Sequence, residues 1–320
     1  MKTIAILDSG ININDDYFKR KVVVSKSFIK DEDEQDQNGH GSLIASTVIE
    51  NYDKVSIWNY KVLDKNGFSD GNTVFEALLS LKNKNVDVVL MCITLDDGLD
   101  NKKIHSICRE LFKEGKVLVC SLDNERRISY PAAYNEVWGV SGAILEKKGC
   151  MWINTNKKIQ VVMDSTPVFR RNNKNAYELF GKCNSFAAAA FCGKLIKHLD
   201  ADNLDYSLEK MNDDVKNKYW ISRKIYRSKR YPIFHPQNVD AGILNIVKQY
   251  TMEYFDLHNK SILERHTMLD EHVGMTYENA YDYICGLEKQ LGMNIRSIEK
   301  ISRDDLYSVY SIGKLFSDLL

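Results

Sequence analysis

Strand-like apolar runs alternate with helix-like segments through the first half of the chain, and this alternation constrains the fold most strongly. Strands are expected at 3–8, 21–24, 55–60, 86–92, 116–121, 137–142 and 159–163, and helices at 41–49, 72–82 and 103–113. Strands connected through helices predict a parallel sheet with helices on both faces. In such sheets, binding and catalytic groups lie beyond the carboxyl ends of the strands.

Two polar residues fall at that edge of the predicted sheet. Asp8 ends the first apolar run and is followed by a turn at Gly10, while Asn124 closely follows the run 116–121. Parallel strands bring their carboxyl ends to one edge, so both side chains are expected there.

Ser185 stands where a polar turn enters a helix with four successive alanines, 187–190. Alanine favours helix, and its small side chain permits close packing against another element. A serine at this position commonly caps the free N–H groups of the helix. The same N–H groups and the helix dipole also stabilise negative charge, which an acyl-transfer nucleophile requires. Both interpretations fit this segment taken alone.

His40 lies between Gly39 and Gly41, at the start of a helix of small residues. Flanking glycines allow other backbone segments to approach the imidazole closely. Along the chain, the aspartate comes first, the histidine second and the serine third, which is the order found in subtilisin.

These segments, 3–10, 38–46 and 181–191, resemble the motifs of the subtilisin-like serine proteases, or subtilases. The resemblance implies a catalytic triad of Asp8, His40 and Ser185. It also implies that the Asn124 side-chain amide stabilises the oxyanion, and that the following Tyr130–Pro131 bond is cis. The serine motif departs from the usual Gly-Thr-Ser-Met-Ala-x-Pro, because Cys183 and Asn184 precede Ser185 and no proline follows. That departure puts the geometry of the turn in question.

The resemblance also places a substrate cleft along Cys92, Ile93 and Thr94, with Gly67 on the opposite wall. Subtilases usually have Ser-Leu-Gly-Gly where this chain has 92–95, and both glycines are missing here. Added side chains predict a narrower and more selective cleft. The alternative is that Thr94 points away from the substrate.

The run 31–37 ahead of His40 is acidic. A solvated loop, a calcium site and a contact for a basic substrate all fit this composition. No ligand spacing distinguishes them, so no metal and no cofactor are assigned.

Charge and cysteine content limit the possible partners and compartment. Lys and Arg together number 44, as do Asp and Glu, which gives no indication of a nucleic-acid or membrane partner. The chain enters its first strand without an apolar signal segment. Its 7 cysteines contain no C-x-x-C pair, so neither a disulfide framework nor a zinc site is indicated. These features predict a cytoplasmic protein.

Three regions are expected: a peptidase domain at 1–200, a linker at 201–238 and a helical domain at 239–320. The basic stretch 223–230 could bind RNA or an acidic partner, or simply belong to the linker. Segments 269–274, 287–291 and 308–315 resemble acyl carrier proteins. Tyr277, with Thr276 beside it, occupies the place of the serine that carries phosphopantetheine. The resemblance therefore implies a carrier-like bundle that contacts a protein partner without bearing the prosthetic group.

The expected fold is thus α/β, with a three-layer parallel sheet of subtilisin type followed by a small all-α helical bundle. The expected function is a cytosolic serine endopeptidase that cleaves a specific precursor peptide. One alternative is a weak or inactive subtilase-fold scaffold within a peptide biosynthetic assembly. Another places the functional core in the carrier-like part.

Overall fold

The computed structural model describes residues 1–95, 99–125, 128–199, 207–208, 210–211 and 230–320. Most of the linker, including positions 223–229 of the basic stretch, therefore lies outside the described residues. The chain folds into two compact units. The first comprises the described residues of 1–165, 172–175 and 181–211, and the second comprises 166–171, 176–180 and 230–320.

The first unit is built on an eight-stranded sheet in the order β2-β3-β1-β4-β5-β6-β8-β7. Its neighbouring strands are parallel except for the pair β7 and β8. The strands are β1 (Lys2–Asp8), β2 (Val22–Ser27), β3 (Val55–Lys61), β4 (Val88–Met91), β5 (Val117–Ser121), β6 (Val137–Ala143), β7 (Met151–Ile153) and β8 (Val161–Asp164). The predicted parallel α/β fold is confirmed.

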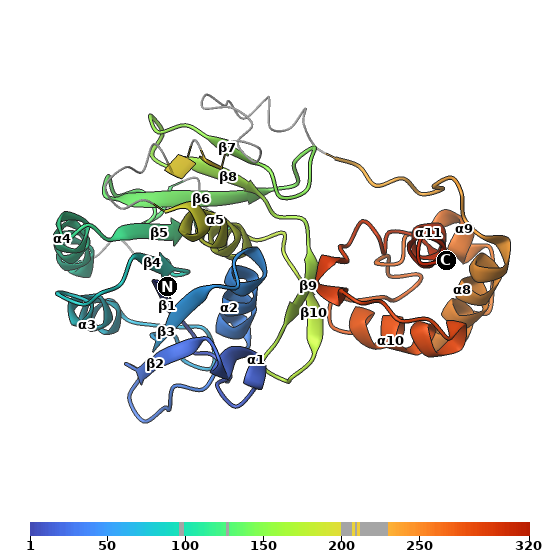
Figure 1. The fold of residues 1–320 in the computed structure, drawn as a ribbon, viewed down its shortest axis with the longest axis horizontal. Coiled ribbons are helices and arrows are strands. Elements are labelled where there is room, and N and C mark those ends of the chain that lie inside the picture. Colours follow the sequence, from blue (N-terminus) through green and yellow to red (C-terminus); the bar gives the residue numbers. More distant parts are fainter. Residues whose placement is uncertain (96–98, 126–127, 200–206, 209, 212–229) are drawn as a thin grey trace. The chain divides into compact units, whose positions relative to one another are not determined.

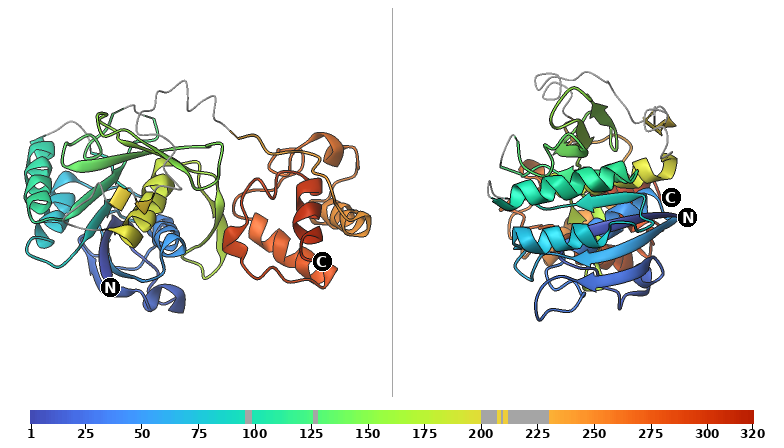
Figure 2. Two further views of the ribbon diagram at one scale, coloured as in Figure 1. Left: turned by 45° about the horizontal axis from the view of Figure 1, so that its top comes forward. Right: turned by 90° about the vertical axis from the view of Figure 1, so that its left-hand side faces the viewer.

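Helices cover both faces of this sheet, which gives the unit three layers (Figures 1 and 2). One face carries α3 (Gly71–Ser80) and α4 (Leu99–Lys113), and the other carries α2 (His40–Asn51) and α5 (Asn184–His198). The short helix α1 (Asp16–Lys19) precedes β2. All four alanines of α5 are almost fully buried, so this helix packs closely against α2 and the central strands, as its small side chains predicted.

The second unit contains the helices of the C-terminal region and one β-hairpin. Its elements are β9 (Val168–Arg171), β10 (Tyr177–Phe180), α8 (Ala241–Tyr254), α9 (Ile262–Arg265), α10 (Ala280–Leu291), the 3₁₀ helix η1 (Ile298–Lys300) and α11 (Val309–Ser317). The predicted small helical region is present, and the hairpin is an addition to it.

The β9–β10 hairpin belongs to this unit because its apolar side chains complete the helical core. Phe169 and Leu179 are buried among residues of α8, α10 and α11. The backbone N–H groups of Phe169 and Leu179 donate to the carbonyls of Ile301 and Tyr277, at 3.1 Å each. Two segments from within the range 1–200 thus fold with the C-terminal helices.

No helix in the described ranges is long and apolar enough to cross a membrane.

Candidate active site

Asp8 and His40 form a direct pair at the carboxyl edge of the sheet. Asp8 is the last residue of β1, and His40 is the first residue of α2. The His40 Nδ1 atom lies 2.8 Å and 3.0 Å from the two carboxylate oxygens of Asp8. The Asp8 side chain is 1% exposed, whereas that of His40 is 30% exposed. The carboxylate can therefore orient an imidazole whose other edge remains accessible.

Close backbone packing holds the two halves of this pair together. A Cβ atom on Gly41 would lie 2.0 Å from the carbonyl oxygen of Gly10, which no side chain could tolerate. Gly10 itself has φ +104°, in the region that favours glycine. The glycines next to His40 and after Asp8 thus allow the start of α2 to press against the turn that ends β1.

Asp36 organises the loop in front of His40. Its Oδ1 atom accepts from the Gly39 N–H at 2.7 Å and from the Ser9 hydroxyl at 2.9 Å, and its Oδ2 atom accepts from the Ser42 N–H at 2.8 Å. Asp36 is only 6% exposed, although its neighbours Asp31 and Asp33 are exposed. One carboxylate of the acidic run is therefore structural, and it satisfies the free N–H groups at the start of α2.

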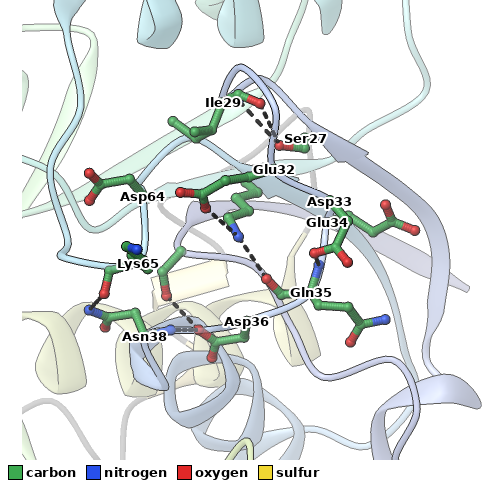
Figure 3. Close-up of polar contacts among 12 residues, drawn as sticks. Ser27, Ile29, Glu32, Asp33, Glu34, Gln35, Asp36, Asn38, Asp64 and Lys65 are labelled. Atoms are coloured by element: carbon green, nitrogen blue, oxygen red, sulfur yellow. Dashed lines mark hydrogen bonds and ion pairs between the residues drawn. The ribbon is translucent and has the colours of Figure 1, made fainter.

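A second carboxylate of this run pairs with a buried lysine. The Lys61 Nζ atom lies 2.9 Å from a Glu32 carboxylate oxygen and donates to the Gln35 carbonyl at 2.8 Å. Figure 3 shows Glu32 and Gln35 on this loop, and also the bond from the Asn38 side chain to the Lys65 carbonyl. That bond connects the loop before His40 with the turn that contains Gly67.

The electrostatic environment favours a protonated imidazole at His40. Burial alone would lower the pKa of His40, but the charge of Asp8 and its hydrogen bond raise it, and the charge of Asp36 adds to them. The pKa of His40 consequently lies above its ordinary value. Burial also raises the pKa of Asp36, against its hydrogen bonds from Gly39, Ser42 and Ser9, which lower it.

Ser185 is the second residue of α5 and is partly exposed. It is not the N-cap. Cys183 takes that position, and its sulfur accepts from the Phe186 N–H at 3.5 Å. The Cys92 sulfur, just beyond β4, lies 4.0 Å from the Ser185 carbonyl oxygen. Because β4 pairs with β1, this contact brings the start of α5 to the sheet edge where Asp8 lies.

Asn124 lies beside the same helix start. Its side-chain oxygen accepts from the Asn184 N–H at 3.0 Å. Asn184 in turn donates its side-chain amide to the Asp123 carbonyl at 3.0 Å and accepts from the Gly142 N–H at 2.7 Å. An Asn124 amide whose oxygen is held in this way directs its NH₂ group away from Asn184, where it can donate to another group.

Asn184 and Asp36 are the positioning residues that the sequence did not single out. Asn184 appeared only as a departure from the usual Gly-Thr-Ser. The sequence indicates its role only through its position immediately before Ser185, in a motif that must fix the start of a helix. Asp36 lies in a run of similar acidic residues, and only its position three residues before Gly39 indicates that it could cap the start of a helix.

The predicted cleft residues differ in their exposure. Cys92 and Ile93 are 7% and 6% exposed, and Ile93 packs into the core on the α3 and α4 side of the sheet. Thr94 and Gly67 are exposed. Side-chain contact with a substrate is thus open to Thr94, whereas Cys92 and Ile93 could offer mainly their backbone. The Leu95 N–H donates to the Tyr130 carbonyl at 3.0 Å, and the Tyr130–Pro131 bond is cis, as predicted.

Comparison with known proteins agrees with this architecture. The chain is 26% identical over 181 residues to "Major intracellular serine protease" of Bacillus subtilis (strain 168), which covers 50% of this chain and 56% of that protein. The chain thus spans little more than half the length of this relative.

Similar solved structures include a cold adapted subtilisin-like serine proteinase, with a TM-score of 0.56 and 15% identity over 69% of this chain and 89% of that one. Sphericase has a TM-score of 0.52 and 16% identity over 65% and 82% of the two chains. At these identities the two structures show a shared fold. The subtilase family matches residues 2–222, and the chain therefore belongs to the subtilase family.

Proposed function

We propose that this protein is a serine endopeptidase in which Ser185 attacks the peptide carbonyl and His40 acts as the general base. The observation that carries the proposal is the Asp8–His40 contact at 2.8 Å, at the sheet edge that also receives the start of α5. His40 would take the hydroxyl proton of Ser185 and later deliver it to the leaving amine. Asp8 would hold the imidazole in its working tautomer and stabilise its charged form.

The negative charge that develops on the carbonyl oxygen needs donors that are already in place. The side-chain NH₂ of Asn124 and the backbone N–H of Ser185 are the proposed donors. The bond from the Asn184 N–H to the Asn124 side-chain oxygen supports this assignment, because it holds the Asn124 side chain at the first turn of α5. The Asn184 side chain is itself held by its bonds with the Asp123 carbonyl and the Gly142 N–H.

The proposed substrate is a specific precursor peptide in the cytoplasm. An exposed Thr94 where subtilases usually have glycine would restrict the cleft, which suits selective cleavage rather than bulk degradation. None of the seven cysteines, all of which lie in the described ranges, forms a disulfide, and the Bacillus subtilis relative is named as intracellular; both facts fit a reducing compartment.

The helical second unit is proposed to bind a protein partner. Tyr277, at the position of the carrier serine, packs partly against the core of this unit, and its carbonyl accepts from Leu179. A phenol held in this way is poorly suited to receive phosphopantetheine. Incubation with coenzyme A and a promiscuous transferase should leave the intact mass unchanged, and an added phosphopantetheine mass would contradict the proposal.

A fluorophosphonate probe tests the catalytic assignment directly. The full-length protein should be labelled on Ser185 and should cleave a peptide library. Ser185→Ala should lose both properties while its melting temperature stays nearly the same, because the hydroxyl is partly exposed. Cys183→Ser is the matched control, since it removes the neighbouring thiol and keeps a side-chain cap for α5. An unlabelled full-length protein would favour the inactive scaffold, and equal turnover by Ser185→Ala would refute the mechanism.

A further inference from the structure

Three side chains that commonly bind metals converge in the second unit, and none of them is assigned to catalysis. The Nδ1 atoms of His266 and His272 lie 3.3 Å and 2.6 Å from the same Asp270 oxygen. All three candidate ligand atoms lie within 4.8 Å of one another. Across the described ranges, no other group of three histidine, cysteine, aspartate or glutamate side chains has this arrangement.

The loop that carries these side chains is firmly held. Met268 donates its N–H to the Tyr307 carbonyl at 3.0 Å, and Met275 donates to the Met268 carbonyl at 3.1 Å. Met268, Val273 and Met275 are each at most 3% exposed. The three polar side chains thus project from a loop whose backbone and apolar residues are fixed, which is the preorganisation that a metal site needs.

One of the three ligand spacings already suits a tetrahedral ion. For zinc bonds of about 2.0–2.1 Å, two ligand atoms of a tetrahedron lie about 3.3 Å apart. The distance from His266 Nδ1 to Asp270 Oδ1 already has this value, at 3.3 Å. The His272 side chain would have to move outward by several tenths of an ångström, and its 54% exposure leaves room for this movement.

We propose that His266, Asp270 and His272 form a binding site for a divalent transition metal, with Zn²⁺ as the best-fitting ion. Two imidazoles and one carboxylate suit zinc and its neighbours, whereas calcium and magnesium prefer oxygen ligands alone. His266 and Asp270 are 30% and 34% exposed, so a water molecule can occupy the fourth position. Binding breaks the two hydrogen bonds to Asp270 and forms three metal–ligand bonds. Each Nδ1 gives up its proton to become a ligand, and the proton of each neutral imidazole is taken up again on Nε2 through solvent, so that both imidazoles bind as neutral ligands.

A metal-free hydrogen-bond cluster is the competing explanation. The two imidazoles, stacked with centroids 4.3 Å apart and planes at 26°, can both donate to Asp270 without an ion. The Nδ1–H groups of His266 and His272 would then donate to the Asp270 carboxylate in the observed geometry, and the cluster would have no affinity for zinc. Zinc binding separates the two explanations.

The experiment uses the 320-residue chain with Ser185→Ala, so that self-cleavage does not interfere. Equilibrium dialysis against ZnCl₂, followed by metal analysis, measures bound zinc in this protein and in versions that also carry His272→Ala or Asp270→Asn. Each of these two double variants should lose one equivalent of bound zinc, or bind it at least ~10-fold more weakly. Even the residues that hydrogen-bond to metal ligands typically contribute 10–100-fold to metal affinity, so a direct ligand should contribute at least as much. Asp270→Asn keeps an oxygen that can accept from the His272 N–H, so the turn is preserved.

The matched control is His258→Ala, which removes an exposed histidine of the same unit outside the cluster. It should bind as much zinc as the parent. Zinc held elsewhere, for example by Asp8 and His40, is common to all variants and cancels in the comparison. Imidazole ¹⁵N spectra should show both Nδ1 atoms of His266 and His272 shifting when zinc is added. Equal zinc content in all variants, or unchanged Nδ1 signals, would overturn the proposal without bearing on the peptidase assignment.

Discussion

Replacing Lys61 with methionine tests whether the buried ion pair under the acidic loop stabilises the first unit. The Lys61 side chain is 0% exposed and its partner Glu32 is 20% exposed. Removing one partner of a buried pair typically costs 3–5 kcal/mol, and the partial exposure of Glu32 places this pair at the lower limit, about 3 kcal/mol. The Gln35 carbonyl also loses its buried donor, which adds about 1 kcal/mol. The free energy of unfolding should therefore fall by about 4 kcal/mol.

Urea unfolding followed by tryptophan fluorescence is the appropriate assay. Within the described residues, the tryptophans are Trp58, Trp138 and Trp152, and all three belong to the first unit, so their fluorescence reports the unfolding of that unit. The double variant Lys61→Met with Glu32→Gln should regain about 2 kcal/mol, because it no longer leaves a carboxylate without its cation.

Lys82→Met is the matched control. Lys82 pairs with Glu110 at 2.7 Å, but the two side chains are 43% and 46% exposed. Exposed pairs contribute about 0–1 kcal/mol, so this variant should unfold almost like the parent. A loss below about 1 kcal/mol for Lys61→Met as well would refute the reasoning, since it would mean that water solvates the Lys61 ammonium.

Three further predictions concern the active site. Because Asp8 raises the pKa of His40, the imidazole should titrate above about 6.5 in NMR spectra of Ser185→Ala. The further substitution Asp8→Asn should lower that titration midpoint, and an unchanged midpoint would contradict the electrostatic assignment. The neutral imidazole is the working base, so peptidase activity should disappear as the pH falls through this pKa. Folding stability should show the opposite dependence, because the stabilisation of protonated His40 by Asp8 is lost as the pH rises through the same pKa. Asn124→Ala should lower kcat by ~10²–10³, the loss known for an oxyanion donor of subtilisin, and a change confined to KM would argue against this role. Thr94→Gly should broaden the residues accepted before the cleaved bond, and an identical peptide-library profile would show that Thr94 does not line the pocket.

The sequence was sufficient where local chemistry and the order of elements decide the structure. The alternation of strands and helices predicted the parallel sheet, and the glycines around His40 predicted a close approach that is visible at Gly10 and Gly41. Asp8 and His40 are 32 positions apart in the sequence, and they meet only because β1 ends and α2 begins at the same edge of the sheet.

Other features depend on contacts that no local pattern encodes. The capping role suggested for Ser185 falls to Cys183, since helix α5 starts one residue before the serine. Asp36 looks like its acidic neighbours in composition, yet it is buried because four donors surround it. Strands β9 and β10 have only four residues each, and the helices that bury them lie far along the chain.

The β9–β10 hairpin imposes an order on the folding of this protein while it is being synthesised. Its two strands fold into the second unit, while its tip at 172–175 belongs to the first unit, where the Asn173 side chain donates to the Asp36 carbonyl at 2.9 Å. On a ribosome the hairpin emerges long before α11, whose Val309, Ile312 and Phe316 share its core. Until that last helix is made, Phe169 and Leu179 lack their partners, and a chain that stops early leaves them exposed. The second unit is therefore no detachable tail, because a chain shortened before Val309 would leave the core around Phe169 and Leu179 incomplete, close in sequence to Ser185.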